Sequence, residues 1–263
     1  MIFPPYRERY LPAMTPRRIA ALPDKAWAPV ILATGAIEQH GAHLPVAVDA
    51  LMGQVWLSLA LARLPAGASC YVAPPITIGK SNEHTGFPGT LMLSRVTLRS
   101  HILAVARQVH EWGFRSIAVI NTHGGNVPVI APTLREIRAI YGMRAGILPS
   151  KAISDLSPQE AAFGIHAGEI ETSWIMAAAR PLVDLSKAVC EFPARLEDPG
   201  EVRPVAAPAL VAWVSRDLSK SGVMGDATAA TAEKGERWLE QGAAGLAAAI
   251  AEICRLGRES ARL

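Results

Sequence analysis

Short apolar runs, each closed by a loop and followed by a helical pattern, constrain the fold of this chain most strongly. Four runs have the length and composition of buried strands: residues 27–33, 70–78, 116–121 and 143–148. Helical patterns cover residues 51–64, 98–112, 168–179 and 231–253, and a further helix is expected after residue 126. Strands that alternate with helices predict an α/β fold with a mainly parallel central sheet covered on both faces, a three-layer α/β/α sandwich. We expect residues 1–263 to form a single domain.

The composition narrows the class of protein. Hydrophobic residues make up 50% of the chain and charged residues 19%, which is typical of a folded globular protein. The 26 basic and 23 acidic side chains are interspersed, so we expect no nucleic-acid partner. Three widely spaced cysteines, Cys70, Cys190 and Cys254, favour a reducing compartment. Neither a signal-peptide pattern nor a membrane-length apolar run is present, which predicts a cytoplasmic protein with no membrane partner.

Residues 180–211 form a proline-rich segment of weak periodicity. We expect it to wrap the surface of the domain or an adjacent subunit with little regular structure. The sequence leaves its topology open.

The loop after the first predicted strand concentrates charge in an apolar neighbourhood. It holds two carboxylates and two imidazoles: Glu38, His40, His43 and Asp49. A buried carboxylate is costly unless it is compensated, and a divalent cation is a common compensation. In an extended loop Glu38 and His40 project to the same side, so they can reach one ion or two adjacent ions. A second interpretation is a polar loop in which Asp49 is the N-cap of the next helix.

Two later segments carry further candidate ligands. His123 directly follows the third predicted strand, and His166 is followed by Glu169 and Glu171. Ligands of open parallel sheets bind beyond the carboxyl ends of the strands. The loops that hold Glu38 and His123 are therefore expected to share one crevice.

Four sequence blocks together resemble the creatininase (creatinine amidohydrolase) family. They are Glu38-Gln39-His40-Gly41-x-His43-Leu44-Pro45 with Asp49, Glu83-His84-x-x-Phe87-Pro88-Gly89-Thr90, Asn121-x-His123-Gly124-Gly125-Asn126 and His166-Ala167-Gly168-x-x-Glu171-Thr172-Ser173. The resemblance extends from about Leu11 to Glu240. It implies a creatininase-like fold, a homo-oligomer that is a hexamer, and a hydrolase acting on carbon–nitrogen bonds other than ordinary peptide bonds.

The resemblance also implies two divalent metal ions. It assigns Glu38 and His123 to one ion and His40 and Glu171 to the other, with Asp49 bridging the two. The ions expected on the basis of these ligand types are Zn²⁺ together with a second Zn²⁺, Mn²⁺ or Fe²⁺.

The same resemblance implies that His166 is the catalytic residue that transfers a proton. An amide nitrogen leaves poorly unless it is protonated, and an imidazole with a pKa near roughly 6.5 can deliver that proton at neutral pH. Ser81, His84 and Asn126 are candidate substrate-binding residues. For His84, a role in supporting its neighbours is an equally open interpretation.

Gly125 departs from creatininase itself, in which a metal-binding glutamate stands two residues after the equivalent of His123. We therefore expect fewer protein ligands on one ion, and creatinine becomes a less favoured substrate. The Gly-Gly-Asn version is similar to the wider family, which includes a formamide hydrolase of flavin and deazaflavin precursor synthesis and the peptidase that trims the mycofactocin precursor.

Three functions stay open. The first is a metal-dependent amidohydrolase that uses a metal-activated water on a cyclic amide, a formamide or a similar bond of a small polar substrate. The second is a mycofactocin-type peptidase acting on a short peptide. The third is a mononuclear Fe(II) oxygenase in which His40, His123 and a carboxylate form a facial triad.

Overall fold

The computed structural model describes residues 4–149, 153–193, 201–204 and 209–260. Its centre is a four-stranded sheet of order β2-β1-β3-β4, formed by Val30–Thr34 (β1), Tyr71–Val72 (β2), Ser116–Asn121 (β3) and Arg144–Leu148 (β4). All three strand pairs are parallel, with Val30 opposite both Tyr71 and Ile117. The prediction of a parallel sheet is confirmed. No helix in the described ranges is long and apolar enough to cross a membrane.

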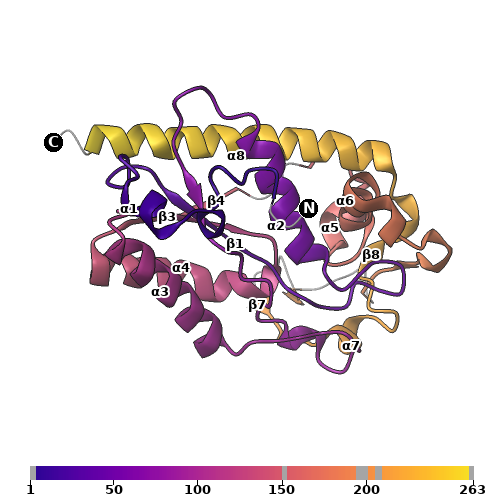
Figure 1. The fold of residues 1–263 in the computed structure, drawn as a ribbon. Helices are drawn as coiled ribbons and strands as arrows, with labels where there is room; N and C mark the ends of the chain where they lie inside the picture. The colour runs from indigo at the N-terminus through magenta and orange to yellow at the C-terminus, as the bar shows by residue number, and fades with distance from the viewer. Residues whose placement is uncertain (1–3, 150–152, 194–200, 205–208, 261–263) are drawn as a thin grey trace.

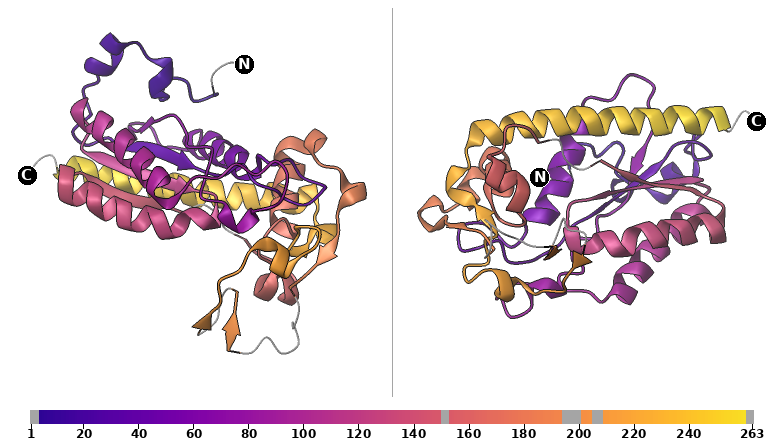
Figure 2. Two further views of the ribbon diagram at one scale, coloured as in Figure 1. Left: turned by 90° about the horizontal axis from the view of Figure 1, so that it is seen from below. Right: turned by 180° about the vertical axis from the view of Figure 1, so that it is seen from behind.

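Helices cover both faces of the sheet (Figure 1, Figure 2). One face carries α2 (Val48–Leu61), α6 (Glu169–Ala179) and the long α8 (Ala232–Ser260), and the other carries α3 (Arg95–Glu111) and α4 (Val127–Tyr141). Two hydrophobic clusters fill the spaces between the layers. Ile31 belongs to one cluster and the next residue, Leu32, to the other, because successive side chains of a strand point to opposite faces. The three-layer α/β/α architecture is confirmed.

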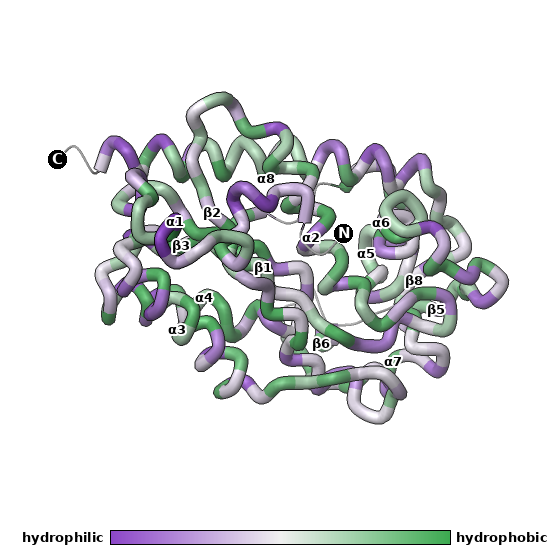
Figure 3. The backbone as a smooth tube through the Cα atoms, viewed as in Figure 1, coloured by the Kyte–Doolittle hydropathy of each residue, from purple (hydrophilic) through white to green (hydrophobic). Residues whose placement is uncertain are grey.

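The long helix α8 closes one layer. Leu239, Leu246 and Ile250 are buried on its inner side, and Figure 3 shows hydrophilic residues recurring between the hydrophobic ones along its length. A side chain at Gly242 would collide with the ring of Trp56, so glycine at this position lets α8 approach α2 closely.

Some element boundaries differ from the sequence-based expectations. β2 spans only two residues because Pro74 and Pro75 follow it and cannot donate to a strand ladder. α2 begins at Val48, so Asp49 lies inside the first turn and Ala47 is the N-cap residue. The interpretation of Asp49 as an N-cap is therefore wrong. α8 continues to Ser260, beyond the predicted end at residue 253.

The remaining elements are short. They are α1 (Pro16–Ala20), α5 (Pro158–Phe163), α7 (Ser215–Leu218), β5 (Cys190–Glu191), β6 (Val202–Arg203), β7 (Ala209–Leu210) and β8 (Gly225–Asp226). β5 pairs with β8, and β6 and β7 form a two-stranded sheet that projects from the layered body (Figure 2). Residues 194–200 and 205–208 of the proline-rich segment lie outside the described residues. Its described part holds two 3-10 helices, Arg180–Leu182 and Leu185–Lys187, and the two-residue strands β5, β6 and β7.

Candidate active site

The segments that hold Glu38 and His123 leave the carboxyl ends of the neighbouring strands β1 and β3. Thr122 ties them together, because its amide donates to the carbonyl of Thr34 (3.0 Å) and its hydroxyl donates to the carbonyl of Asp49 (2.7 Å). The second bond draws the first turn of α2 toward the end of β3. Three segments thus meet in one crevice, as predicted for ligands of a parallel sheet.

Asp49 lies between two groups of possible donor atoms. Its Oδ2 is 3.4 Å from His123 Nδ1, which lies 3.3 Å from Glu38 Oε2. Its Oδ1 is 3.9 Å from His40 Nε2, which lies 3.7 Å from Glu171 Oε2. The structure thus brings the five predicted ligands together in two adjoining sets, and their binding of metal stays a prediction.

These donor atoms fit divalent ions. Among the described residues, Glu38 Oε2, Asp49 Oδ2 and His40 Nε2 are buried and have no hydrogen-bond partner. An unpaired buried polar group costs about 1–3 kcal/mol, so three of them facing one crevice call for a common partner. The ligands of a tetrahedral zinc ion, at about 2.1 Å from it, lie roughly 3.4 Å from one another. The separations of 3.3 and 3.4 Å from His123 to Glu38 and Asp49 are close to this value, and ligand atoms of Glu38, His40 and Asp49 all lie within 4.8 Å of one another.

In three histidines, a hydrogen bond to a backbone carbonyl determines which of the two ring nitrogens faces the crevice. The ring N–H groups donate in three bonds: His40 Nδ1 to Glu38 O (3.0 Å), His123 Nε2 to Lys80 O (3.0 Å) and His166 Nε2 to Gln39 O (2.6 Å). The other nitrogen of each neutral ring carries a lone pair, which it presents to the crevice. Such outer partners orient histidine ligands in metal sites.

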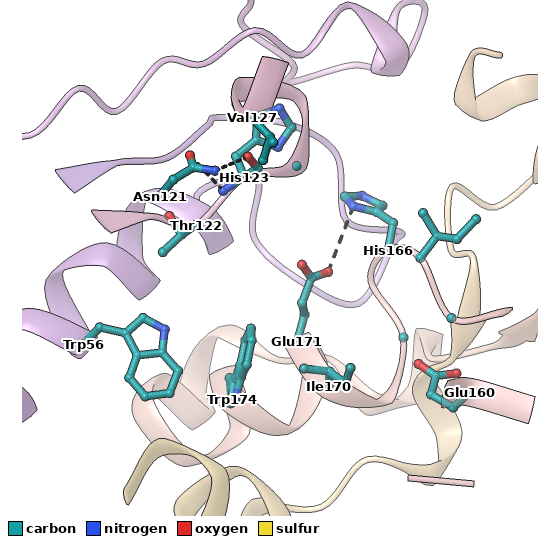
Figure 4. Close-up of a pocket in the computed structure, with 14 residues that line it drawn as sticks. Trp56, Asn121, Thr122, His123, Val127, Glu160, His166, Ile170, Glu171 and Trp174 are labelled. Atoms are coloured by element: carbon teal, nitrogen blue, oxygen red, sulfur yellow. Dashed lines mark hydrogen bonds and ion pairs between the residues drawn. The ribbon is translucent and has the colours of Figure 1, made fainter. Parts of the chain in front are cut away.

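His166 lies between the rings of His40 and His84, with ring centroids 4.2 and 4.3 Å away. Its Nδ1 is 3.7 Å from Glu38 Oε1 and 4.0 Å from Glu171 Oε2. Figure 4 shows the Glu171 carboxylate pointing toward this ring across the cavity. Nδ1 can therefore take up a proton beside two carboxylates or bind an ion, and the proton-transferring role of His166 stays a prediction.

The electrostatics show how strongly the crevice favours positive charge. Burial, reinforced by the charges of Glu38 and Glu171, raises the pKa of Asp49 well above its usual value. Burial alone lowers the pKa of His123, but the nearby carboxylates of Asp49, Glu38 and Glu83 raise that pKa far above the usual value. Burial and the neighbouring His166 ring hold the pKa of His40 well below its usual value. The raised pKa of His123 favours a second proton on its Nδ1, and a divalent ion bound at Nδ1 would take the place of that proton.

A cavity of about 280 Å³ opens beside this crevice. His123, His166 and Glu171 form its polar wall, and Trp174 and Ile170 form part of its apolar wall (Figure 4). No lysine or arginine is among the described residues that line it. The basic side chains of the described lining are therefore the two histidines, His123 and His166.

Glu83 occupies the space beside Gly125. A Cβ atom at Gly125 would lie well under 3.0 Å from Glu83 Oε1, from the carbonyl oxygen of Lys80 and from His123 Nε2. Glu83 Oε1 is 3.4 Å from His123 Nε2, the nitrogen that faces away from the other ligands. Glu83 therefore supports His123 from behind and does not replace the ligand that creatininase has two residues after its histidine.

The three candidate substrate-binding residues are buried, and the described lining of the cavity includes none of them. Ser81 Oγ lies 3.4 Å from His123 Nε2, and the Asn126 side chain donates to the carbonyl of Gly35 and accepts from the amide of Lys80. His84 Nε2 lies 3.3 Å from a carboxylate oxygen of Glu38. Burial, with a contribution from His166, lowers the pKa of His84 to about 4. Their direct contact with substrate stays a prediction.

Glu160 is a buried residue of the site that the sequence-based reasoning missed. Its Oε1 accepts from the amide of Glu169 (3.0 Å) at the start of α6, and its Oε2 accepts from the amide of Asp226 (2.8 Å) in β8. Side chains at Gly164 or Gly168 would collide with its carboxylate. Glu160 therefore fixes the turn between His166 and α6. The glycines around His166 were the only available signal, since α5 was not predicted.

Comparisons with known proteins identify the family of this chain. The family model described as creatinine amidohydrolase matches residues 12–250. The chain is 33% identical over 210 residues to the mycofactocin precursor peptide peptidase of Mycolicibacterium smegmatis, a match that covers 79% of this chain and 78% of the relative. It is 31% identical over 246 residues to the creatinine amidohydrolase of Pseudomonas putida, covering 85% of this chain and 88% of the relative.

Solved creatininases have the same fold. A creatininase carrying a single tryptophan-to-alanine substitution, 28% identical, aligns with a TM-score of 0.70 over 94% of this chain and 98% of that one. Two others, a creatininase described as the manganese form (26% identical) and a mutant creatininase described as the Zn-Zn type (25% identical), each cover 96% of both chains, with TM-scores of 0.64 and 0.63. The match spans most of the chain in both sequence and structure. This protein belongs to the creatininase family.

Proposed function

We propose that this protein is a metal-dependent hydrolase that cleaves a carbon–nitrogen amide bond of a small polar substrate. One observation carries the proposal: the two carboxylate oxygens of Asp49 face two separate sets of donor atoms, of which only Glu171 is partly exposed. The relatives described as manganese and zinc types support divalent ions, with Zn²⁺, Mn²⁺ and Fe²⁺ as candidates.

The five donor residues would hold two ions. Glu38 and His123 would bind one, His40 and Glu171 the other, and Asp49 would bind both. Bound there, the ions would supply an activated water and a polarised amide carbonyl. Because α2 and the ends of β1 and β3 are rigid elements, the ligands would need little rearrangement on binding.

His166 would deliver the proton to the leaving nitrogen. The carbonyl of Gln39 holds Nε2–H, so Nδ1 is the atom that takes up and releases the proton. The carboxylates of Glu38 and Glu171 lie within 4.0 Å of Nδ1 and stabilise the protonated ring.

The size of the cavity favours a small substrate. Its volume of about 280 Å³ lies near the lower end of the roughly 300–1,000 Å³ of ligand pockets. Glu171 and Glu160 are part of its lining, and no lysine or arginine is among its described lining residues. Cyclic amides and formamides meet this size requirement, and creatinine is less favoured because of Gly125.

A short peptide is the second candidate substrate. The Mycolicibacterium smegmatis relative is a peptidase and is 33% identical to this chain, which is why peptide bonds belong in any test. A mononuclear Fe(II) oxygenase is the third candidate, because His40, His166 and Glu171 form a group of two histidines and one carboxylate, although the predicted triad contained His123 in place of His166. The homo-hexamer and the cytoplasmic location stay predictions.

A substrate panel on the metal-free and metal-restored protein tests the proposal. The panel contains lactams, formamides and short peptides, with release of amine or formate as the readout. We expect turnover of a small amide or peptide only after Zn²⁺ or Mn²⁺ is restored, without uptake of oxygen. Full turnover by the metal-free protein, or turnover that consumes oxygen, would contradict the proposal.

A further inference from the structure

The amide of Gln39 links the loop after β1 to two distant segments. Its Oε1 accepts from the backbone amide of Gly41 (2.9 Å), and its Nε2 donates to the carbonyl of Gly222 (3.0 Å). Because one partner can only donate and the other can only accept, the orientation of the side-chain amide is fixed. The same Nε2 lies 2.9 Å from His84 Nδ1.

This contact determines where His84 carries its proton. Gln39 Nε2 is a donor only, so His84 Nδ1 must accept. The hydroxyl of Ser215, 2.9 Å from the same nitrogen, can donate as well. The proton of the neutral ring is therefore on Nε2, which lies 3.3 Å from Glu38 Oε1.

His84 consequently has no lone pair to offer in the crevice. Its Nε2 lies close to Glu38 and His166, and these three residues resemble a cation-binding group by distance alone. The hydrogen-bond pattern excludes that role, because Nε2 is a donor. The two oxygens of Glu38 face different histidines: Oε1 faces the N–H of His84, and Oε2 faces Nδ1 of His123.

We propose that His84 is a positioning residue that donates its Nε2–H to Glu38 and orients this carboxylate for a metal ion, with Gln39 setting its tautomer. The inference rests on the proposed function, because it assumes that Glu38 binds an ion. It differs from substrate binding, the other role considered for His84, and it explains why a buried histidine outside the cavity lining lies against a ligand.

The inference also gives the segment from Ser215 to Gly222 a role. Gly222 has φ +89°, and a side chain there would collide with Gln39 Oε1, so glycine is required for the contact that orients the amide. Ser215 is fully buried against His84. A segment far along the chain thus supports the first metal-binding motif.

Two variants of one residue test the inference. His84→Met introduces a flexible apolar side chain of similar volume and removes the Nε2–H donor. His84→Gln removes the ring but places an N–H group at a comparable distance from the backbone. Affinity and stoichiometry are measured by titrating metal-free protein with Zn²⁺ against a chromophoric chelator. Thermal unfolding of each metal-free variant shows whether the fold is intact.

We expect His84→Met to weaken one of the two Zn²⁺ sites about 10–100-fold, the usual effect of losing an outer hydrogen-bond partner, and His84→Gln to keep most of the affinity. Wild-type affinity in His84→Met would overturn the inference, as would equal losses in the two variants. These outcomes are distinct from failure of the proposed function, in which the wild-type protein itself binds no ion and both ideas fall.

Discussion

Alanine substitutions at Gly125 and at its neighbour Gly124 form a matched pair that tests how closely atoms are packed around His123. A Cβ atom at Gly125 would lie well under 3.0 Å from the Lys80 carbonyl oxygen and from His123 Nε2, whereas one at Gly124 would meet nothing within 4 Å. Ordinary contacts are about 3.5–4.0 Å, so Gly125→Ala has to displace the His123 ring or the loop at Lys80 by about 1 Å. Overpacking of this kind costs about 1–3 kcal/mol.

The displacement of the His123 ring should also weaken the binding of metal. Metal–ligand distances are held to within about 0.2 Å, so a ring moved by about 1 Å is no longer a good ligand. We expect Gly125→Ala to lose about 1–3 kcal/mol of unfolding free energy in urea and at least roughly tenfold in Zn²⁺ affinity. Gly124→Ala should keep both, or gain about 0.4–1 kcal/mol of stability through a less flexible unfolded chain.

A double variant separates the causes. Glu83→Ala removes the movable carboxylate beside Gly125 but leaves the Lys80 carbonyl and the His123 ring in place. Gly125→Ala should therefore remain defective in the Glu83→Ala background. The reasoning would be refuted if Gly125→Ala and Gly124→Ala had the same stability and the same Zn²⁺ affinity.

Three further predictions concern residues near the crevice. Glu160→Ala leaves the backbone amides of Glu169 and Asp226 unpaired and should lower the unfolding free energy by about 2–4 kcal/mol in denaturant titrations, and a loss below about 1 kcal/mol would be inconsistent with its buried bonds. Burial, then His166, lowers the pKa of His43 to about 4, so metal-free protein should lose stability as the pH falls from about 6.5 to 4. His43→Gln should remove roughly 3 kcal/mol of this loss in unfolding curves at the two pH values, and an unchanged pH dependence would argue against a neutral buried ring. His166→Ala should keep its metal content and lose turnover, whereas loss of metal would identify His166 as a ligand.

The sequence predicted most of the architecture because the signals were local. Apolar runs such as 116–121 and the loop that follows residue 34 indicated strands and a shared crevice without any knowledge of long-range contacts. Asp49 was the exception, because the choice between an N-cap and a first-turn residue depends on where α2 begins, and that is set by packing against the sheet. The proline pair after β2 shortened a strand that composition alone made too long.

The supporting residues could not be predicted in the same way. Glu160, Ser215 and Gly222 act through contacts with segments far away in sequence, and nothing next to them in the chain marks them as polar groups of a site. The candidate ligands were recognised because carboxylates and imidazoles in an apolar stretch are chemically conspicuous. A residue that only forms a hydrogen bond to a candidate ligand has no comparable signal in the sequence, so it is recognised only once the fold is known.

The metal content of wild-type protein and of Asp49→Ala tests the central claim most directly, because Asp49 alone contributes to both donor sets. Elemental analysis after reconstitution with Zn²⁺ or Mn²⁺ and gel filtration gives the number of ions per chain. The two-ion account predicts two in the wild-type protein and loss of both in folded Asp49→Ala. A wild-type protein that holds no ion or a single iron, or an Asp49→Ala variant that keeps two ions, would contradict it.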